Sequence, residues 1–155
     1  MTIKKKIKNS SNPILLLDID GVLKIRDEDG DLENYFNQNC VYFLNEIIIE
    51  TDCLIILSSD WRLHYNLKVI GEIFQDGGII KKPIDYTPDF WTKTTSIYDC
   101  EKIRKREILD WLKKNPTNKW CAVDDMKLEL DNFVQCDSTK GITKNIKDKI
   151  VKFLK

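Results

Sequence analysis

This sequence lacks several patterns, and each lack excludes a class of protein. No apolar run approaches the roughly 20 residues that a membrane-spanning helix needs. The opening stretch MTIKKKIKNSSNP precedes only four aliphatic residues, too few for the apolar region of a secretory signal. The 25 basic and 25 acidic residues balance, so the net charge does not by itself indicate a nucleic-acid or membrane partner. We therefore expect a cytoplasmic protein.

The five cysteines also lack the pattern of a disulfide framework or a zinc site. They are odd in number, scattered and without any CxxC spacing, so we expect reduced thiols. No repeat, low-complexity tract or linker divides the 155 residues, which suffice for one domain with a sizeable core. We expect a basic N-terminal segment at residues 1–13 and a single domain at residues 14–155. The segment is either a solvated tail or a contact for a phosphate backbone.

Apolar runs that alternate with helical patterns are present throughout the rest of the chain. Strands covered on both faces are predicted at residues 14–17, 53–59 and 119–125. Weaker strands are expected at residues 78–80 and 133–135. Helices are predicted at residues 39–50, 61–74, 101–115 and from about 144. This alternation predicts an α/β three-layer sandwich with a mostly parallel, Rossmann-like sheet.

The first strand ends in two acids. In ILLLDIDGVL, residues 14–23, Asp18 and Asp20 are alternate residues and are expected to point to the same face. Two carboxylates this close repel each other unless a cation lies between them or one holds a proton. The alternative for this stretch alone is a strand that ends in a polar turn without a ligand.

Two further strands end in polar residues, and all three ends are expected to meet. Parallel sheets bring the carboxyl ends of neighbouring strands to one edge, where ligands bind. This predicts a crevice with four acids and two hydroxyl groups: Asp18, Asp20, Asp124, Asp125, Ser58 and Ser59. Such oxygen ligands suit Mg²⁺, which takes one or two carboxylates, water and a substrate phosphate.

The helix predicted at residues 101–115 offers a cation to this crevice. Ile108 and Trp111 mark its buried face, and Arg104 lies on the same face. The helix leads directly into a strand of the sheet, so its first turn should lie at the acidic edge. Arg104 is therefore the first candidate, and Lys105 is the second.

These motifs together resemble the haloacid dehalogenase (HAD) superfamily of phosphohydrolases. The resemblance rests on DIDGVL, a serine that ends the second buried strand, a basic residue at a helix start and a terminal Asp-Asp pair. SSDWR, Thr87-Pro88 and the run RKREILDWL from Arg104 resemble more narrowly the small HAD domains of Swiss Army Knife type RNA-repair proteins. The inserted Asp60 departs from the commoner SSWR of that pattern. The resemblance covers residues 14–125 and implies a HAD-like fold.

The resemblance also implies roles for individual residues. Asp18 would be the nucleophile that forms an aspartyl-phosphate, and Asp20 the general acid and then the general base. Ser58 would donate a hydrogen bond to a phosphoryl oxygen, and Arg104 would offset the charge there.

The implied cofactor is Mg²⁺. Its ligands would be Asp18, the backbone carbonyl of Asp20 and Asp125, with Asp124 assisting.

The intervals between these motifs are too short for a separate cap domain of about 50 residues or more. We therefore expect an open site, screened in part by a hairpin at residues 24–36 and a loop at residues 84–100. An open site suits a phosphate on a large substrate, such as an RNA or DNA end. Ser59 and Arg62 are the predicted substrate contacts, and Trp91 is a further candidate for gripping a nucleic-acid backbone.

The sequence thus predicts a magnesium-dependent phosphomonoester hydrolase, with a polynucleotide phosphatase as the first choice. A 5′(3′)-nucleotidase or small-metabolite phosphatase is the alternative. The alternative from another class is a non-catalytic phosphate-binding module, because fold does not determine function.

Overall fold

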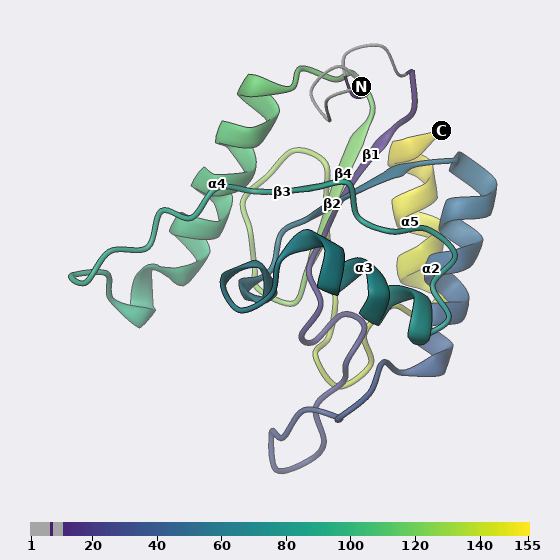
Figure 1. Ribbon diagram of the computed structural model, residues 1–155, viewed down its shortest axis with the longest axis horizontal. Coiled ribbons are helices and arrows are strands. Elements are labelled where there is room, and N and C mark those ends of the chain that lie inside the picture. The colour runs from purple at the N-terminus through teal and green to yellow at the C-terminus, as the bar shows by residue number, and fades with distance from the viewer. Residues whose placement is uncertain (1–6, 8–10) are drawn as a thin grey trace.

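The structure is a computed structural model that describes residue 7 and residues 11–155. Most of the predicted basic segment at residues 1–13 lies outside the described residues. Strands and helices alternate along the chain, in the order β1-α2-β2-α3-β3-α4-β4-β5-α5 (Figure 1).

The centre of the molecule is a five-stranded sheet in the order β3-β2-β1-β4-β5. The strands are β1 Ile14–Leu17, β2 Leu54–Leu57, β3 Asp85–Tyr86, β4 Trp120–Asp124 and β5 Phe133–Gln135. All four neighbouring pairs are parallel, with residues 14–17 of β1 opposite residues 54–57 of β2 and residues 120–123 of β4. The predicted mostly parallel α/β sheet is therefore confirmed.

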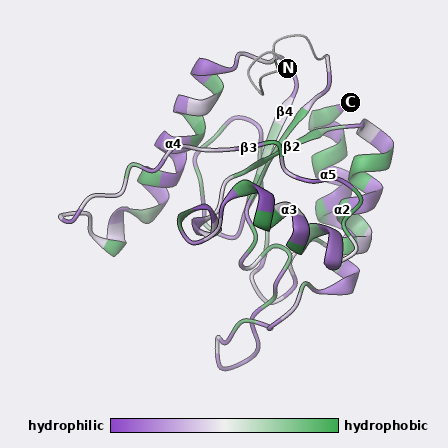
Figure 2. Cartoon of the chain, in the orientation of Figure 1, coloured by the Kyte–Doolittle hydropathy of each residue, from purple (hydrophilic) through white to green (hydrophobic). Residues whose placement is uncertain are grey.

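Helices cover both faces of this sheet and complete three layers (Figure 1). Three helices pack on one face: α2 Gln38–Thr51, α3 Leu67–Asp76 and α5 Lys144–Leu154. The fourth, α4 Cys100–Lys114, packs on the other. Leu15 and Leu17 of β1 face the three helices, whereas Leu16 faces α4. Burial on both faces explains why the strands are continuous apolar runs, which Figure 2 shows at the centre of the molecule.

Short-range signals set the helix ends. The side chains of Asn37, Asn66 and Thr143 accept hydrogen bonds from the first free N–H groups of α2, α3 and α5. Helix α4 ends at Lys114, two residues before Pro116, as the sequence predicts.

Two predicted elements differ from the structure. The third strand is not at residues 78–80 but at β3, inside the predicted loop. Since β3 is a two-residue edge strand, no periodic pattern marks it, and only its pairing with β2 defines it. The helix predicted at residues 61–74 is two helices, a 3-10 helix at Asp60–Leu63 and α3, because the Asn66 cap starts a new one.

No separate cap domain interrupts residues 11–155. After β1 the chain forms a small hairpin, in which Arg26 and Leu32 pair in antiparallel fashion around Gly30, which has φ +84°. Before α4 it forms a long loop that ends in a 3-10 helix at Ile97–Asp99. None of the described helices has both the length and the apolar character needed to cross a bilayer. The carboxyl edge of the sheet is thus flanked by a hairpin and a loop.

Candidate active site

Four neighbouring strands each place one polar side chain in a single row at the carboxyl edge of the sheet. Parallel pairing continues one residue beyond the strands, because the N–H groups of Ser58, Asp18 and Thr87 donate to adjacent strands at 2.8, 3.1 and 3.0 Å. Thr87, Ser58, Asp18 and Asp124 therefore lie side by side, with strands spaced about 4.8 Å apart. The residue two positions before each of them contacts α4 or the apolar cluster beneath it. Because alternate residues of a strand face the same side, the row also faces α4. All four residues are buried.

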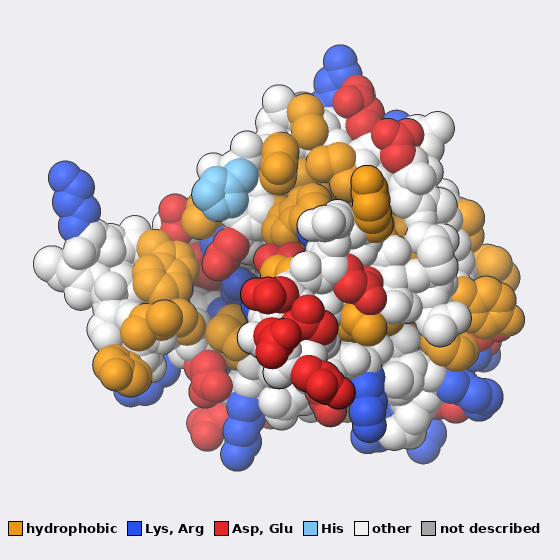
Figure 3. Space-filling model, turned by 90° about the horizontal axis from the view of Figure 1, so that it is seen from below, with side chains coloured by type: hydrophobic (Ala, Val, Ile, Leu, Met, Phe, Trp, Pro, Cys, Tyr) orange, Lys and Arg blue, Asp and Glu red, His pale blue; other side chains and the backbone are white. Residues whose placement is uncertain are grey.

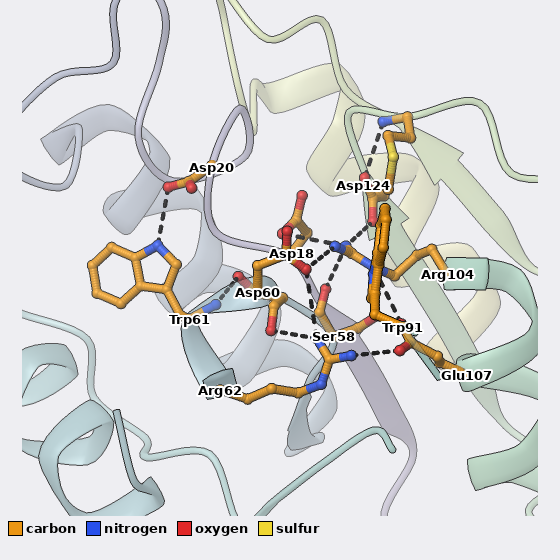
Figure 4. A network of polar contacts seen from close by, with 12 residues as sticks. Asp18, Asp20, Ser58, Asp60, Trp61, Arg62, Trp91, Arg104, Glu107 and Asp124 are labelled. Atoms are coloured by element: carbon orange, nitrogen blue, oxygen red, sulfur yellow. Dashed lines mark hydrogen bonds and ion pairs between the residues drawn. The ribbon is translucent and has the colours of Figure 1, made fainter. Parts of the chain in front are cut away.

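Arg104 of α4 lies against this row (Figure 4). Its Nη1 donates to Asp124 Oδ2 at 2.7 Å and to the Ser58 carbonyl at 2.8 Å, and lies 3.5 Å from Asp18 Oδ1. Its Nη2 lies 3.2 Å from Asp60 Oδ1. Burial lowers the pKa of Arg104. The surrounding carboxylates, Asp18 foremost, raise it by more than burial lowers it, so the net shift of the pKa is upward. The guanidinium therefore stays charged.

Asp18, Asp124 and Asp125 form a group that can hold a metal ion. One carboxylate oxygen of each lies within 4.8 Å of the others. Gly21 allows this approach, because its φ is +80° and a Cβ there would collide with the Asp125 carboxylate. Hard oxygen ligands of this kind fit Mg²⁺.

The electrostatics of this group also fit a divalent cation. Burial, and next the Asp124 carboxylate, raise the pKa of Asp18 well above its usual range, although Arg104 opposes this. Burial likewise raises the pKa of Asp124 to about 6, again against the lowering effect of Arg104. One guanidinium therefore does not compensate the buried acids. A divalent ion beside them would supply the missing positive charge.

Asp20 lies outside this side-chain group and turns to Trp61 (Figure 4). Its Oδ1 accepts a hydrogen bond from Trp61 Nε1 at 3.1 Å, and Lys24 Nζ lies 5.3 Å from the centre of the Trp61 ring. Asp20 comes three residues after the end of β1, so strand alternation no longer determines its direction. A metal contact through its backbone carbonyl stays a prediction.

The two serines after β2 have different surroundings. Ser58 Oγ is buried and has no hydrogen-bond partner among the described residues. An unsatisfied buried polar group costs about 1–3 kcal/mol, so a ligand oxygen at this place would be stabilised. Ser59 Oγ instead accepts from the Trp61 N–H at 3.3 Å and caps the 3-10 helix.

Arg62 is bonded inside the protein. Its Nη2 lies 2.6 Å from Glu107 Oε2 and donates to the Pro88 carbonyl at 3.1 Å, while Nη1 donates to the Ser59 carbonyl at 2.7 Å. The side chains of Arg62 and Glu107 are 2% and 0% exposed. Glu107 also accepts from the Phe90 N–H at 2.9 Å. This pair ties the turn after β2, the loop before α4 and α4 itself together.

Some of the predicted site residues lie together in the structure, and others do not. The structure brings together the following: Asp18, Ser58, Arg104, Asp124 and Asp125. Lys105 lies on the outer side of α4, so Arg104 is the cation at the row. Arg62, predicted as a substrate contact, has partners inside the protein, because the 3-10 helix turns it toward Glu107.

Sequence reasoning missed Glu107 and the bond between Trp61 and Asp20. A signal for Glu107 exists, since it lies on the same helical face as Arg104, Ile108 and Trp111 and is thus an acid on a buried face. No local pattern signals the partner of Trp61, which comes from a segment 41 positions away.

The strand ends, the buried arginine and the metal-binding acids coincide with the four sequence motifs, and they define a HAD-type, magnesium-dependent phosphatase. Residues 14–146 match the family described as HAD domain in Swiss Army Knife RNA repair proteins, and the chain belongs to that family. No curated protein matches the chain. Among solved structures, it is similar to 3-deoxy-D-manno-octulosonate 8-phosphate phosphatase from Moraxella catarrhalis, crystallised with magnesium, phosphate and KDO. The identity is 13% and the TM-score 0.45, over 97% of this chain and 90% of that chain.

Proposed function

We propose that residues 14–155 form one domain that hydrolyses phosphomonoesters, with Asp18 as the nucleophile. The observation that carries this is the position of the Asp18 carboxylate, which lies in the row between the orphan Ser58 hydroxyl and Asp124, with Arg104 against it. This arrangement surrounds one carboxylate with a hydrogen-bond donor and a fixed positive charge. Both are needed to receive a phosphoryl group.

The reaction has two steps. An Asp18 carboxylate oxygen bonds to phosphorus as the bond from phosphorus to the ester oxygen breaks, and Asp20 gives its proton to the departing oxygen. Asp20 then takes a proton from water, whose oxygen attacks phosphorus, so inorganic phosphate leaves and Asp18 is regenerated. The Trp61 Nε1 bond holds the Asp20 carboxyl in place for both transfers.

Other side chains hold the transferred group. Ser58 Oγ donates to one phosphoryl oxygen, and Arg104 offsets the charge on the others. Asp18, Asp124, Asp125 and the Asp20 carbonyl would hold Mg²⁺, which would supply positive charge against the phosphoryl oxygens. Ser59 and Arg62 support the site by fixing the turn after β2.

The substrate we propose is a phosphorylated RNA or DNA end. Two observations support it: the family is named for RNA-repair proteins, and no separate cap domain closes the site within the described residues. A nucleotidase or a small-metabolite phosphatase is the alternative. A non-catalytic phosphate-binding module is disfavoured, because the chain has both carboxyl groups that the reaction needs, Asp18 and Asp20.

The test is a substrate screen. Oligonucleotides with a 3′- or 5′-phosphate would be compared with the matching mononucleotides, sugar phosphates and an aryl phosphate, with Mg²⁺ or excess chelator. We expect the largest kcat/KM for one oligonucleotide class, activity only with Mg²⁺ and none from Asp18→Asn. Equal or faster turnover of mononucleotides would favour the nucleotidase, and no turnover at all would refute the enzyme assignment.

A further inference from the structure

The two sides of the active site carry opposite charge. On one side the hairpin after β1 exposes four acids near its tip: Asp27, Glu28, Asp29 and Asp31. Figure 3, viewed from the hairpin end, shows acidic side chains gathered at the centre of this face. On the other side the outer face of α4 carries four cations: Lys102, Lys105, Arg106 and Lys113. A polyanion with its end in the site is thus repelled from the hairpin and attracted to α4.

We call the four cations the α4 stripe. Lys102, Lys105 and Arg106 lie within about one turn, and Leu109 continues the same face to Lys113 with spacings of three or four residues. The 12 residues from Lys102 to Lys113 span about 16 Å along the axis. Since one strand of a duplex has a phosphate about every 3.4 Å of helix axis, this length corresponds to several phosphates.

Two acids, Glu101 and Asp110, line the same grooves as these cations, but within the described part of the chain neither forms an ion pair with them. Among residues 11–155, none of the four forms an ion pair, whereas Lys144 of α5 lies 2.8 Å from Asp148 and Lys114 of α4 lies 2.9 Å from Asp110. Neighbouring like charges on a helix repel each other, so the stripe is stabilised when an anion binds along it.

Two grooves border the stripe. The first, of about 360 Å³, has Phe90 and Arg106 in its lining, with the guanidinium 4.6 Å from the ring centre. The second, of about 480 Å³, is lined by Glu101, Lys102, Lys105, Lys127 and Glu129. Lys102 is two residues from Arg104, and Lys127 is two residues from Asp125. The second groove therefore lies between the first turns of α4 and the segment that follows the Asp124-Asp125 pair.

We propose that the α4 stripe binds the phosphate backbone of the nucleic-acid strand whose phosphorylated end occupies the active site. This rests on the proposed function and adds the surface that holds the polymer. Backbone contacts of this kind carry no base information, so the stripe sets affinity and direction and not sequence preference. Phe90, already stacked with a guanidinium, offers an aromatic surface for a base in the first groove.

The test measures binding without turnover. In an Asp18→Asn background, the stripe variant Lys102→Glu/Lys113→Glu is compared with the control Lys149→Glu/Lys152→Glu. The control makes the same charge change at exposed lysines of α5, on the opposite face of the sheet. Fluorescence anisotropy with a labelled, 3′- or 5′-phosphorylated single-stranded 12-mer is recorded over a range of salt concentrations.

We expect the stripe variant to bind about tenfold or more weakly, and its slope of log K against log salt to fall by about one to two. The control should stay within about twofold. Equal weakening in both variants would overturn the proposal, as would no binding by the parent. Tighter binding of the parent to phosphatidylserine vesicles than to the 12-mer would also overturn it.

Failure of the stripe and failure of the proposed function have different signatures. If the Asp18 protein hydrolyses the 12-mer end with Mg²⁺ and the stripe variant does so with unchanged kcat/KM, the stripe is wrong and the active site stands. If no phosphate ester is hydrolysed but the stripe variant still loses 12-mer binding, the stripe stands and the enzyme assignment is wrong.

Discussion

Arg62 and Arg104 belong to one polar network but lie in opposite surroundings (Figure 4). Both terminal nitrogens of Arg62 are bonded to Glu107 and to backbone carbonyls. Arg104 instead faces an excess of negative charge and a hydroxyl group without a partner. Burial alone therefore does not distinguish a structural ion pair from a reactive one. The balance of charge around each guanidinium does, because the Arg62 pair also contains buried atoms without a hydrogen-bond partner, Arg62 Nε and Glu107 Oε1.

This difference predicts separate effects on activity and stability. The Arg62 pair joins three chain segments, so its loss should mainly reduce the free energy of unfolding. The acids beside Arg104 repel each other, so removal of one carboxylate there should reduce turnover with little loss of stability, or with a gain.

The largest effect is expected from Asp18→Asn. Removing the nucleophile should lower kcat by about 10⁴-fold or more. The melting temperature without metal should stay equal or rise, because the amide removes a buried charge beside Asp124. Steady-state rates on an aryl phosphate measure the change in kcat, and a thermal melt in chelator measures the change in melting temperature. Near-native turnover would refute the covalent mechanism.

The two arginines can be compared directly with Arg62→Met and Arg104→Met. Arg62→Met leaves Glu107 buried without its partner and should cost about 3–5 kcal/mol of unfolding free energy, measured in urea. Arg104→Met leaves Asp18 and Asp124 without their cation and should also cost stability, but unlike Arg62→Met it should lower kcat directly by about 10²- to 10³-fold. Lys114→Met, which breaks an exposed pair on the same helix, is the control, with an expected cost below about 1 kcal/mol. Similar losses of kcat in the folded Arg62→Met and Arg104→Met proteins would remove the distinction.

A smaller effect is expected when pH is varied without metal. Asp18 and Asp124 have raised pKa values in the folded protein, so the folded state binds protons more readily than the unfolded state, where carboxyl pKa values are near 3.9. Their stabilising contribution is complete below that value. It is lost as pH rises through the folded value, about 6 for Asp124.

The melting temperature in chelator should therefore fall through this pH range. Mg²⁺ binds the deprotonated carboxylates, so it should raise the melting temperature by a few degrees more at pH 7.5 than at pH 5. Differential scanning fluorimetry measures both quantities. An Mg²⁺ shift that is equal at the two pH values would argue against a site built from these acids.

The smallest effect is expected from Trp61→Phe, which removes the hydrogen bond to Asp20 and keeps an aromatic ring. Loss of one such bond, about 1 kcal/mol, should lower kcat about fivefold. The loss should be greater for alkyl than for aryl phosphates, because poor leaving groups depend more on the proton from Asp20. Equal losses for both substrates would show that Trp61 does not position the acid.

Much of the fold could be predicted because its signals are local. The runs that become β1, β2 and β4 are apolar throughout since both faces are covered, and Pro116 follows the end of α4. The presence of Asp18, Ser58 and Asp124 at strand ends follows from the same pattern. Strand β3 could not be predicted, because two residues have no periodicity and their pairing partner is remote in sequence.

The sequence by itself determined which chemical groups stand at the carboxyl edge, because a strand's end and a helix's buried face are properties of neighbouring residues. Only the tertiary structure decided how those groups are used. Helical spacing places Arg104 on the buried face of its helix, but no local pattern names the partners of either Arg62 or Arg104. The packing of α4 against the turn after β2 turns one toward Glu107 and the other toward Asp18 and Asp124, because each ion pair joins segments 20 or more residues apart.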